Sequence, residues 1–274
     1  MAEVLRDRID SGELPVGDAM PTQAALVKEF EVQRGVVRGA LKILQEEGRL
    51  TEPTRGAPAR VAGAEAADGT PRPTLVVLGP RIDAAFGAEH VRLDAICLTA
   101  ESLNMAFGEQ CRLICTRKSV PATVKVRVLM PNRDINLAFP RMISSPEEAD
   151  PVHRRWLQMR NAHGTVLRDH LRELGSAHDI DVDVEFKALP FTPPVKLYLI
   201  NGSEALFAYY RVTERETEID RRPVALYDAL GSESLLFSFG AEAGKPHRDQ
   251  AFVEQSQVWF EALWTTIATD LDLS

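Results

Sequence analysis

The chain has 274 residues, of which 45% are hydrophobic and 26% charged, and its formal net charge is −8. The length allows two compact domains, and the acidic balance argues against a generally sticky nucleic-acid binder, although one basic face is enough to attract DNA. The apolar runs are far shorter than a membrane span and the first residues lack an apolar signal core, so we expect a cytoplasmic protein with no membrane partner.

Residues 1–61 show three helical patterns followed by a turn-rich segment. The first helix is expected to end at Gly12, and the second runs from Gln23 to about Phe30 with Thr22 as its N-cap. The third is expected from Arg34 to Glu47, because its apolar positions share one face. These positions are Val37, Leu41 and Leu44. "RLTEPTRGAPARV" then predicts two short strands around a Gly/Pro tip, which completes a winged helix-turn-helix.

A change of composition divides the chain. "AGAEAADGTPRP", residues 62–73, is small and polar with Gly and Pro, so we expect a linker between a domain at 1–61 and a larger one at 74–274. Residues 1–61 hold nine Lys/Arg and ten Asp/Glu, a net charge of −1. The acidity therefore belongs mainly to the larger domain.

The larger domain alternates apolar runs with helical patterns. Near-continuous apolar runs are typical of buried strands in an α/β sheet. We predict strands at 74–79, 93–100, 124–131, 181–189, 195–202 and 206–212, and helices at 101–113, 147–174 and 250–271. The expected fold class is α/β in two domains, an N-terminal winged helix and a larger layered α/β domain.

The first 61 residues resemble the GntR family of winged-helix transcription regulators. The resemblance covers about 60 residues in one ungapped register. It is carried by Ile9, Gly12, Leu14, Gly17, Met20-Pro21-Thr22, Leu26, Phe30, Val32, Arg34, Val37-Arg38, Ala40-Leu41, Leu44, Gly48, Arg55-Gly56, Pro58 and Val61. The resemblance implies that the third helix reads the major groove of double-stranded DNA and that the wing approaches the duplex.

The candidate DNA-binding residues follow from that placement. Arg34 and Arg38 are four residues apart and so share the outward face of the third helix, where arginine can bind guanine or phosphate. The full set is Thr22, Gln33, Arg34, Val36, Arg38, Arg55, Gly56 and Arg60. The competing interpretation is a solvated face in which the arginines are balanced by Glu31, Glu46 and Glu47.

Two positions depart from the family pattern. The family usually has Ser where Gln33 stands and Thr where Val36 stands. Val36 lacks the hydroxyl that would contact phosphate or a base. We therefore expect an operator that differs from the common family sequence.

The larger domain shows a patchier resemblance, from Leu93 to Trp264, to one half of the phospholipase D fold. In that superfamily a strand carries His-x-Lys, then four residues and Asp. Here Pro194 stands in place of His, Lys196 matches Lys, and Asn201 replaces Asp. Because proline offers no nucleophile, we expect no catalytic residue and no phosphodiesterase. Lys196, Asn201 and Ser203 remain candidate ligand-binding residues, with an exposed Lys196 of no function as the competing interpretation.

No metal or cofactor site is expected. The three cysteines are Cys97, Cys111 and Cys115, a sparse set that is typical of reduced thiols. Cys111 and Cys115 are four residues apart, but with no histidine nearby and no second pair they are better read as small buried hydrophobes.

The sequence therefore predicts a sequence-specific DNA-binding transcription regulator. The expected form is a ligand-responsive repressor that binds a palindromic operator as a homodimer, because one winged helix contacts too few bases for operator specificity. Two alternatives stay open. One is a phospholipase D-type phosphodiesterase with a DNA-binding head, and the other is a DNA-bound protein-interaction module without a small-molecule effector.

Overall fold

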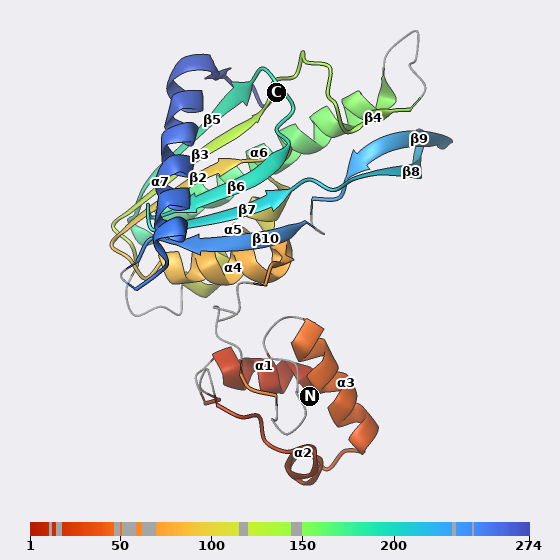
Figure 1. Cartoon of the computed structure of the whole chain (residues 1–274), viewed down its shortest axis with the longest axis vertical. Helices are drawn as coiled ribbons and strands as arrows, with labels where there is room; N and C mark the ends of the chain where they lie inside the picture. The colour runs from red at the N-terminus through yellow and green to blue at the C-terminus, as the bar shows by residue number, and fades with distance from the viewer. Residues whose placement is uncertain are drawn as a thin grey trace. The chain divides into compact units, whose positions relative to one another are not determined.

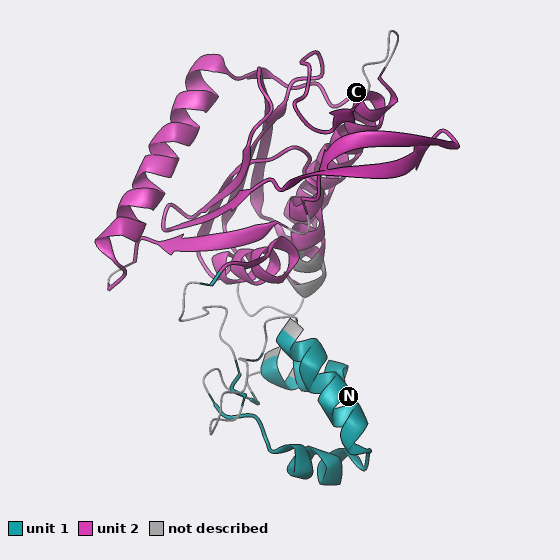
Figure 2. Ribbon diagram, turned by 45° about the vertical axis from the view of Figure 1, so that its right-hand side comes forward, with its two compact units in different colours: residues 1–70 teal, residues 71–274 magenta. Residues whose placement is uncertain are grey.

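The computed structural model divides the chain into two compact units, Met1–Thr70 and Pro71–Ser274, which Figure 2 colours separately. It describes residues 1–10, 13–14, 18–46, 50, 59–61, 70–114, 120–143, 150–231, 234–242 and 244–274. Each unit has its own hydrophobic core, so each is described by itself.

The first unit is a three-helix domain. The helices are α1 (Ala2–Asp10), α2 (Gln23–Phe30) and α3 (Arg34–Glu46), and the predicted second and third helices are confirmed to within one residue. Their buried core consists of Leu5, Met20, Leu26, Val37, Leu44, Leu50 and Val61. Two isolated bridges, Ala19 with Arg60 and Leu50 with Val61, mark the base of the predicted wing. The first unit therefore has the predicted helical arrangement with its apolar faces inward.

The second unit is built on an eight-stranded mixed sheet (Figure 1). The strand order is β1-β10-β7-β6-β2-β3-β5-β11. The bounds are β1 Arg72–Pro73, β2 His90–Ile96, β3 Thr123–Pro131, β5 Asp181–Leu189, β6 Val195–Ile200, β7 Glu204–Tyr209, β10 Leu235–Gly240 and β11 Thr269–Asp270. Strands β2, β3 and β5 are parallel, whereas β6, β7 and β10 pair antiparallel with their neighbours. The sheet thus changes direction between β2 and β6.

Helices cover both faces of this sheet, as predicted for a layered α/β domain. One core joins the sheet to α4 (Thr74–Ala85), α5 (Glu101–Leu113) and α6 (Pro151–His178). A second core joins it to α7 (His247–Ala262) and the π-helical turn Leu263–Ile267. Strand β6 shows why both faces are needed, because its alternate side chains enter different cores. Tyr198 and Ile200 face the first, and Leu197 and Leu199 face the second. No helix within the described ranges is both long and apolar enough to cross a membrane.

A second, three-stranded sheet forms an arm that extends from the body of unit 2 (Figure 2). It consists of β4 (Arg141–Met142), β8 (Val212–Ile219) and β9 (Arg222–Ala229), in the order β4-β9-β8. The β8–β9 turn has two residues with positive φ, Asp220 and Arg221, as a type I′ hairpin turn requires. No strand was expected here, because β8 is mostly charged and its turn lacks the usual Asn-Gly or Asp-Gly signal.

One predicted strand is wrong. Residues 74–79 were expected to form a strand but belong to helix α4. A short apolar run does not by itself distinguish a strand from a buried helix. Leu78, Ile82 and Ala85 are spaced by four and three residues and are all buried, whereas Leu75 is exposed, so the helical period decides the outcome.

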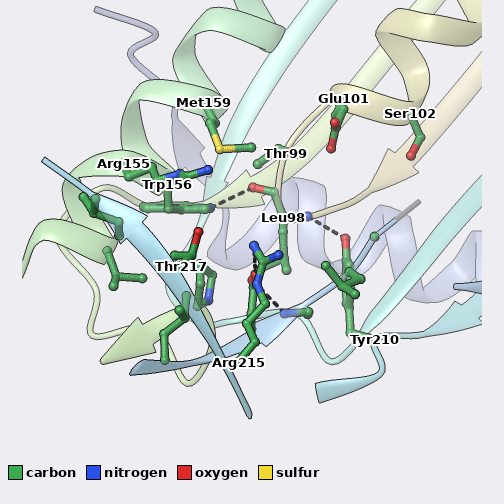
Figure 3. Close-up of a pocket in the computed structure, with 18 of the residues that line it drawn as sticks. Leu98, Thr99, Glu101, Ser102, Arg155, Trp156, Met159, Tyr210, Arg215 and Thr217 are labelled. Atoms are coloured by element: carbon green, nitrogen blue, oxygen red, sulfur yellow. Dashed lines mark hydrogen bonds and ion pairs between the residues drawn. The ribbon is translucent and has the colours of Figure 1, made fainter. Parts of the chain in front are cut away.

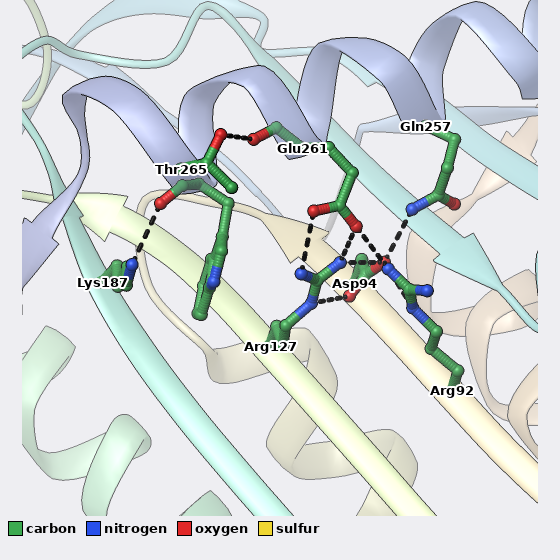
Figure 4. Close-up of polar contacts among 8 residues, drawn as sticks. Arg92, Asp94, Arg127, Lys187, Gln257, Glu261 and Thr265 are labelled. Carbon is green, nitrogen blue, oxygen red and sulfur yellow. Dashed lines mark hydrogen bonds and ion pairs between the residues drawn. The ribbon is translucent and has the colours of Figure 1, made fainter.

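A charged network ties α7 to the sheet (Figure 4). The buried carboxylate of Asp94 accepts from Arg127 Nε at 2.7 Å and from Gln257 Nε2 at 3.0 Å. The Arg127 guanidinium also binds Glu261, and hydrogen bonding to Arg127 lowers the pKa of Glu261 to about 2. The guanidinium lies 4.9 Å from the centre of the Phe260 ring. Each charge in this network already has protein partners, so the network reads as structural.

Candidate functional site

The exposed face of α3 carries the predicted DNA-reading side chains. Gln33, Arg34 and Arg38 are exposed, whereas Val37 and Leu44 are fully buried against the rest of unit 1. The structure therefore places both arginines on the outward face, one turn apart. The positive end of the helix dipole lies at this same turn and favours phosphate.

The N-terminal turn of α3 has no side-chain cap of the family type. The carbonyl of Gln33 accepts from the amide of Val36 at 3.0 Å, so Gln33 stands at the N-cap position. A Ser there would cap the helix with its hydroxyl, whereas Gln is a poorer cap. Its longer amide side chain can instead reach outward to a base or phosphate. Val36 is half exposed and offers a methyl surface of the kind that contacts thymine.

Thr22 begins helix α2, as predicted. Its Oγ1 accepts from the amide of Ala25 at 3.2 Å, and the residue is exposed. A hydroxyl has one donor and two acceptor sites, so the proton of Thr22 can still be donated to a phosphate. The capping role is observed, and the phosphate contact stays a prediction.

The wing residues are only partly described. Arg60 is exposed and pairs with Ala19 across an isolated bridge. Arg55 and Gly56, which were predicted at the wing tip, lie outside the described residues. The bridges at Leu50 and at Arg60 and Val61 agree with two short segments that pair at the base of the predicted wing, and the contacts of its tip stay a prediction.

Gly39 gives a direct test of how α3 is placed. A Cβ at this position would have nothing within 4 Å, and Gly in an exposed helix interior costs about 0.5–1 kcal/mol relative to Ala. Gly39→Ala is therefore expected to raise the stability of unit 1 by about that amount. Hydrogen exchange of the α3 amides in the full chain measures it.

The matched control is Gly202→Ala. A Cβ there also has nothing within 4 Å, but φ is +67°, which L residues rarely adopt. This variant is expected to destabilise unit 2, to which Gly202 belongs, and to leave the exchange of the α3 amides unchanged. Faster exchange of the α3 amides in Gly39→Ala would contradict an exposed helical Gly39.

The second unit contains a cavity of about 240 Å³ (Figure 3). It lies at the carboxyl end of β2, where the sheet changes from parallel to antiparallel pairing, a common position for ligand sites in α/β proteins. Its walls come from the β2–α5 loop, the first turn of α5, the N-terminal half of α6, the start of β6 and the β8–β9 arm.

Two aromatic residues hold the β2–α5 loop at the cavity. Trp156 Nε1 donates to the carbonyl of Leu98 at 3.1 Å, and the amide of Leu98 donates to Tyr210 Oη at 2.8 Å. Figure 3 shows both hydrogen bonds. Burial raises the pKa of Tyr210 well above its ordinary value, so its hydroxyl stays protonated. Both polar backbone groups of Leu98 are therefore satisfied by side chains from distant parts of the chain.

Lys196 is the buried cation of this cavity. It is 3% exposed, and its Nζ donates to Ser102 Oγ at 3.2 Å and to the carbonyl of Gly231 at 2.5 Å. The Nζ also lies 5.7 Å from the centre of the Tyr210 ring. Desolvation lowers the pKa of Lys196 to about 8. The predicted ligand-binding lysine thus lines a cavity and is not an exposed strand-end residue.

The other two candidate ligand residues lie elsewhere. Asn201 and Ser203 are in the β6–β7 loop, at the end of β6 opposite Lys196, about 16 Å along the strand. Asn201 Oδ1 accepts from the amide of Arg92 at 2.8 Å, and Asn201 and Gly202 both have positive φ. The structure gives Asn201 a turn role and does not bring it together with Lys196. The Asn-Gly pair between two apolar runs is a hairpin signal that could have predicted this.

Sequence reasoning missed most of the cavity. Trp156, Arg155, Tyr210, Arg215 and Asp228 were not predicted to meet, and no motif joins them. Arg215 Nη2 lies 2.5 Å from Asp228 Oδ2 across the two strands of the arm. Within the described residues, no cluster of three His, Cys, Asp or Glu is arranged to hold a metal ion.

Comparison with known proteins assigns the first unit. Residues 1–57 match the family described as "Bacterial regulatory proteins, gntR family". The N-terminal unit is a GntR-family helix-turn-helix domain, which confirms the resemblance for this part of the chain.

Individual relatives cover less of the chain. Over 47 residues, 17% of this chain, the sequence is 49% identical to the mannosyl-D-glycerate transport/metabolism system repressor MngR of Escherichia coli (strain K12). The chain spans only 20% of the length of that relative. A solved structure of TrmBL2, described as an archaeal chromatin protein with a novel mode of DNA binding, aligns over 99% of this chain and 98% of its own. The sequence identity is 12% and the TM-score 0.34. A score this low defines no common fold.

Proposed function

We propose that the protein is a sequence-specific transcription regulator, a repressor that binds a palindromic operator as a homodimer and responds to a small ligand. The observation that carries the proposal is the exposed face of α3, where Gln33, Arg34 and Arg38 stand together on a GntR-family domain. The relative MngR, which is named a repressor, supports the sign of regulation. Such a regulator acts in the cytoplasm, where the DNA is.

The proposal of a homodimer rests on the number of base pairs that one winged helix can contact. One winged helix reads too few base pairs for operator-grade specificity, whereas a two-fold dimer reads two half-sites separated by about one helical turn or a multiple of it. The net charge of −1 over residues 1–61 supports the same conclusion, because a weakly charged domain gains little from non-specific attraction.

The second unit is proposed to bind a ligand rather than to catalyse a reaction. If it is one half of a phospholipase D-like fold, Pro194 and Asn201 stand where the nucleophile and its acidic partner would be. Lys196 remains and lines a cavity, but an ammonium group alone supplies no nucleophile on phosphorus. The cavity therefore supports an effector site, and none of the described residues that line it is a histidine of the kind the phosphodiesterase alternative needs.

Footprinting on the DNA upstream of the protein's own gene tests the proposal. We expect two protected half-sites of inverted sequence, and sedimentation equilibrium should give a dimer at the protein concentration that saturates the footprint. A single protected half-site bound with full affinity by a monomer would contradict the homodimer. Absence of any protected sequence there and in a genomic selection would contradict operator binding.

A further inference from the structure

We propose that the cavity of unit 2 binds a small organic anion with an apolar body. Its acidic group is held by Lys196 and the first turn of α5, and its apolar body lies between α6 and the β8–β9 arm. The regulatory meaning of this site rests on the proposed function, but the binding itself does not.

The polar end of the cavity carries an unbalanced positive charge. Lys196 is 3% exposed, and its two hydrogen-bond acceptors, Ser102 Oγ and the carbonyl of Gly231, are both neutral. Within the described part of the chain, no carboxylate lies within 4.0 Å of its ammonium group, although the field of Glu101 reaches it. A buried charge without a counter-charge is costly, and an anionic ligand would supply the missing partner.

The first turn of α5 adds to this attraction. Helix α5 starts at Glu101, and Ala100 before it offers no capping side chain. Amides at a helix N-terminus favour an anion, and Thr99 and Ser102 line the cavity here. The carboxylate of Glu101 also lines the cavity and opposes part of this attraction, so Lys196 supplies the main favourable charge. The hydroxyl of Ser102 accepts from Lys196 and also hydrogen-bonds the phenol of Tyr198, so it positions the ammonium group of Lys196 beside this turn.

The walls formed by α6 and the arm carry apolar side chains beside the polar Arg155, Arg215 and Thr217. These apolar side chains are Trp156, Met159, Ile219 and Leu226. The indole N–H of Trp156 is already bound to the carbonyl of Leu98. The remaining surface of this indole ring therefore needs no polar partner and suits a hydrocarbon or aromatic group.

Neighbouring arginines do not change this assignment. Arg215 is paired with Asp228 at 2.5 Å, and Arg155 donates to the carbonyl of Glu218 at 3.3 Å. The charges of Arg215 and Arg155 are balanced by polar groups of the arm or by solvent. The buried ammonium group of Lys196 has neither an ion-pair partner among the described residues nor access to solvent. The charge of the ligand is accordingly placed at the Lys196 end.

The size of the cavity limits the ligand further. Ligand pockets are commonly about 300–1,000 Å³. At about 240 Å³ this cavity is below that range, which suits a short acyl or aryl acid and excludes a nucleotide or a peptide.

Calorimetric titration of the full chain, without DNA, tests the proposal. The probes are straight-chain carboxylates from acetate to octanoate, the matching alkyl phosphates and the matching neutral amides. Affinity is expected to rise with chain length in one of the two acid series, which identifies carboxylate or phosphate as the head group. The neutral amides are expected to bind at least tenfold more weakly, because a charge-assisted hydrogen bond is lost.

Three variants locate the site. Lys196→Met is expected to lower the affinity for the tightest-binding probe about tenfold or more. Lys125→Met changes an exposed lysine on β3 and is expected to leave that affinity unchanged. Met159→Gln keeps the size of a partly exposed side chain, so it should fold, and it is expected to remove the gain with chain length while leaving acetate binding unchanged.

Several outcomes would overturn the proposal. These are equal binding of the neutral amides, unchanged binding to Lys196→Met, no dependence on chain length, or no binding of either acid series in the millimolar range. Operator binding is measured separately, so these failures leave the DNA-binding proposal standing, and loss of operator binding leaves the anion site standing.

Discussion

Replacing Arg34 and Arg38 together by alanine is expected to weaken operator binding by about 100-fold or more. Each good arginine contact to a base contributes about 1–3 kcal/mol of discrimination, and two such contacts lie on one face of α3. The loss should be largest for the operator and smaller for unrelated DNA. If one arginine binds phosphate instead, the salt dependence of binding should fall by about one unit of slope.

Fluorescence anisotropy with an operator duplex and a scrambled duplex measures both effects. The matched control removes two exposed arginines from α6, as Arg154→Ala with Arg172→Ala, and therefore changes the net charge equally. Because Arg34 and Arg38 are exposed, the variant should keep its helix content and thermal stability. Operator binding as tight and as specific as that of the wild type would show that α3 is not the reading helix.

Lys196→Met is expected to stabilise unit 2 at pH 7 by about 1–2 kcal/mol. Burial lowers the pKa of Lys196 from its ordinary 10.5 to about 8, a difference equivalent to about 3 kcal/mol. The folded state carries this cost below pH 8, where Lys196 is charged in both the folded and the unfolded protein. Methionine removes this cost but also loses two hydrogen bonds, each contributing about 1 kcal/mol as a neutral interaction, because the effect of the charge is already counted in the pKa.

The pH dependence gives the sign of the effect. Between pH 8 and 10.5, Lys196 binds more protons in the unfolded wild-type protein than in the folded one. The free energy of unfolding of the wild type therefore rises with pH in this range, whereas that of Lys196→Met lacks this contribution. The advantage of Lys196→Met should therefore be full at pH 7, disappear near about pH 9, and become a disadvantage by about pH 10.5. Burial also raises the pKa of Cys97, to about 12, but this group is common to both proteins.

Denaturant unfolding followed by tryptophan fluorescence measures this prediction in the full chain. All three tryptophans, Trp156, Trp259 and Trp264, belong to unit 2, so the signal reports that unit. Lys125→Met, at an exposed position of β3, is the control and should change stability by less than about 0.5 kcal/mol. A less stable Lys196→Met protein at pH 7, or an unchanged difference at pH 10.5, would refute the account of Lys196 as an uncompensated buried charge.

The first unit was predictable because its signals are local. Helix α2 is marked by its N-cap Thr22, and α3, which begins at Arg34, is marked by a 3.6-residue apolar period. The strands β3 and β6 were also found, because their apolar runs of strand length differ from amphipathic helices. Strand β5 was found as well, and its first half alternates exposed and partly buried residues, which is also typical of a strand. The error at residues 74–79 arose where such a run begins a longer helix.

The cavity could be predicted only at Lys196. Its other walls depend on which distant segments meet, and no local pattern states that Trp156 and Tyr210 hold the same backbone residue, Leu98. The β8–β9 arm was missed for a related reason, because its strands are solvated and lack an apolar alternation that would mark them. Asn201 was predicted to bind a ligand, but the Gly that follows it indicates a turn.

The two hydrogen bonds to the backbone of Leu98, from Trp156 and to Tyr210, determine which part of the cavity can move when a ligand binds. The β2–α5 loop is fixed by Trp156 of α6 and by Tyr210 at the end of β7, so the Lys196 end of the cavity is pre-organised and a ligand need not reorder it. The arm instead meets α6 through a small apolar cluster of Val152, Ile219, Val224 and Leu226. We therefore expect the rigid β2–α5 loop to determine which ligand binds. We expect the β8–β9 arm to change its position when the ligand is bound.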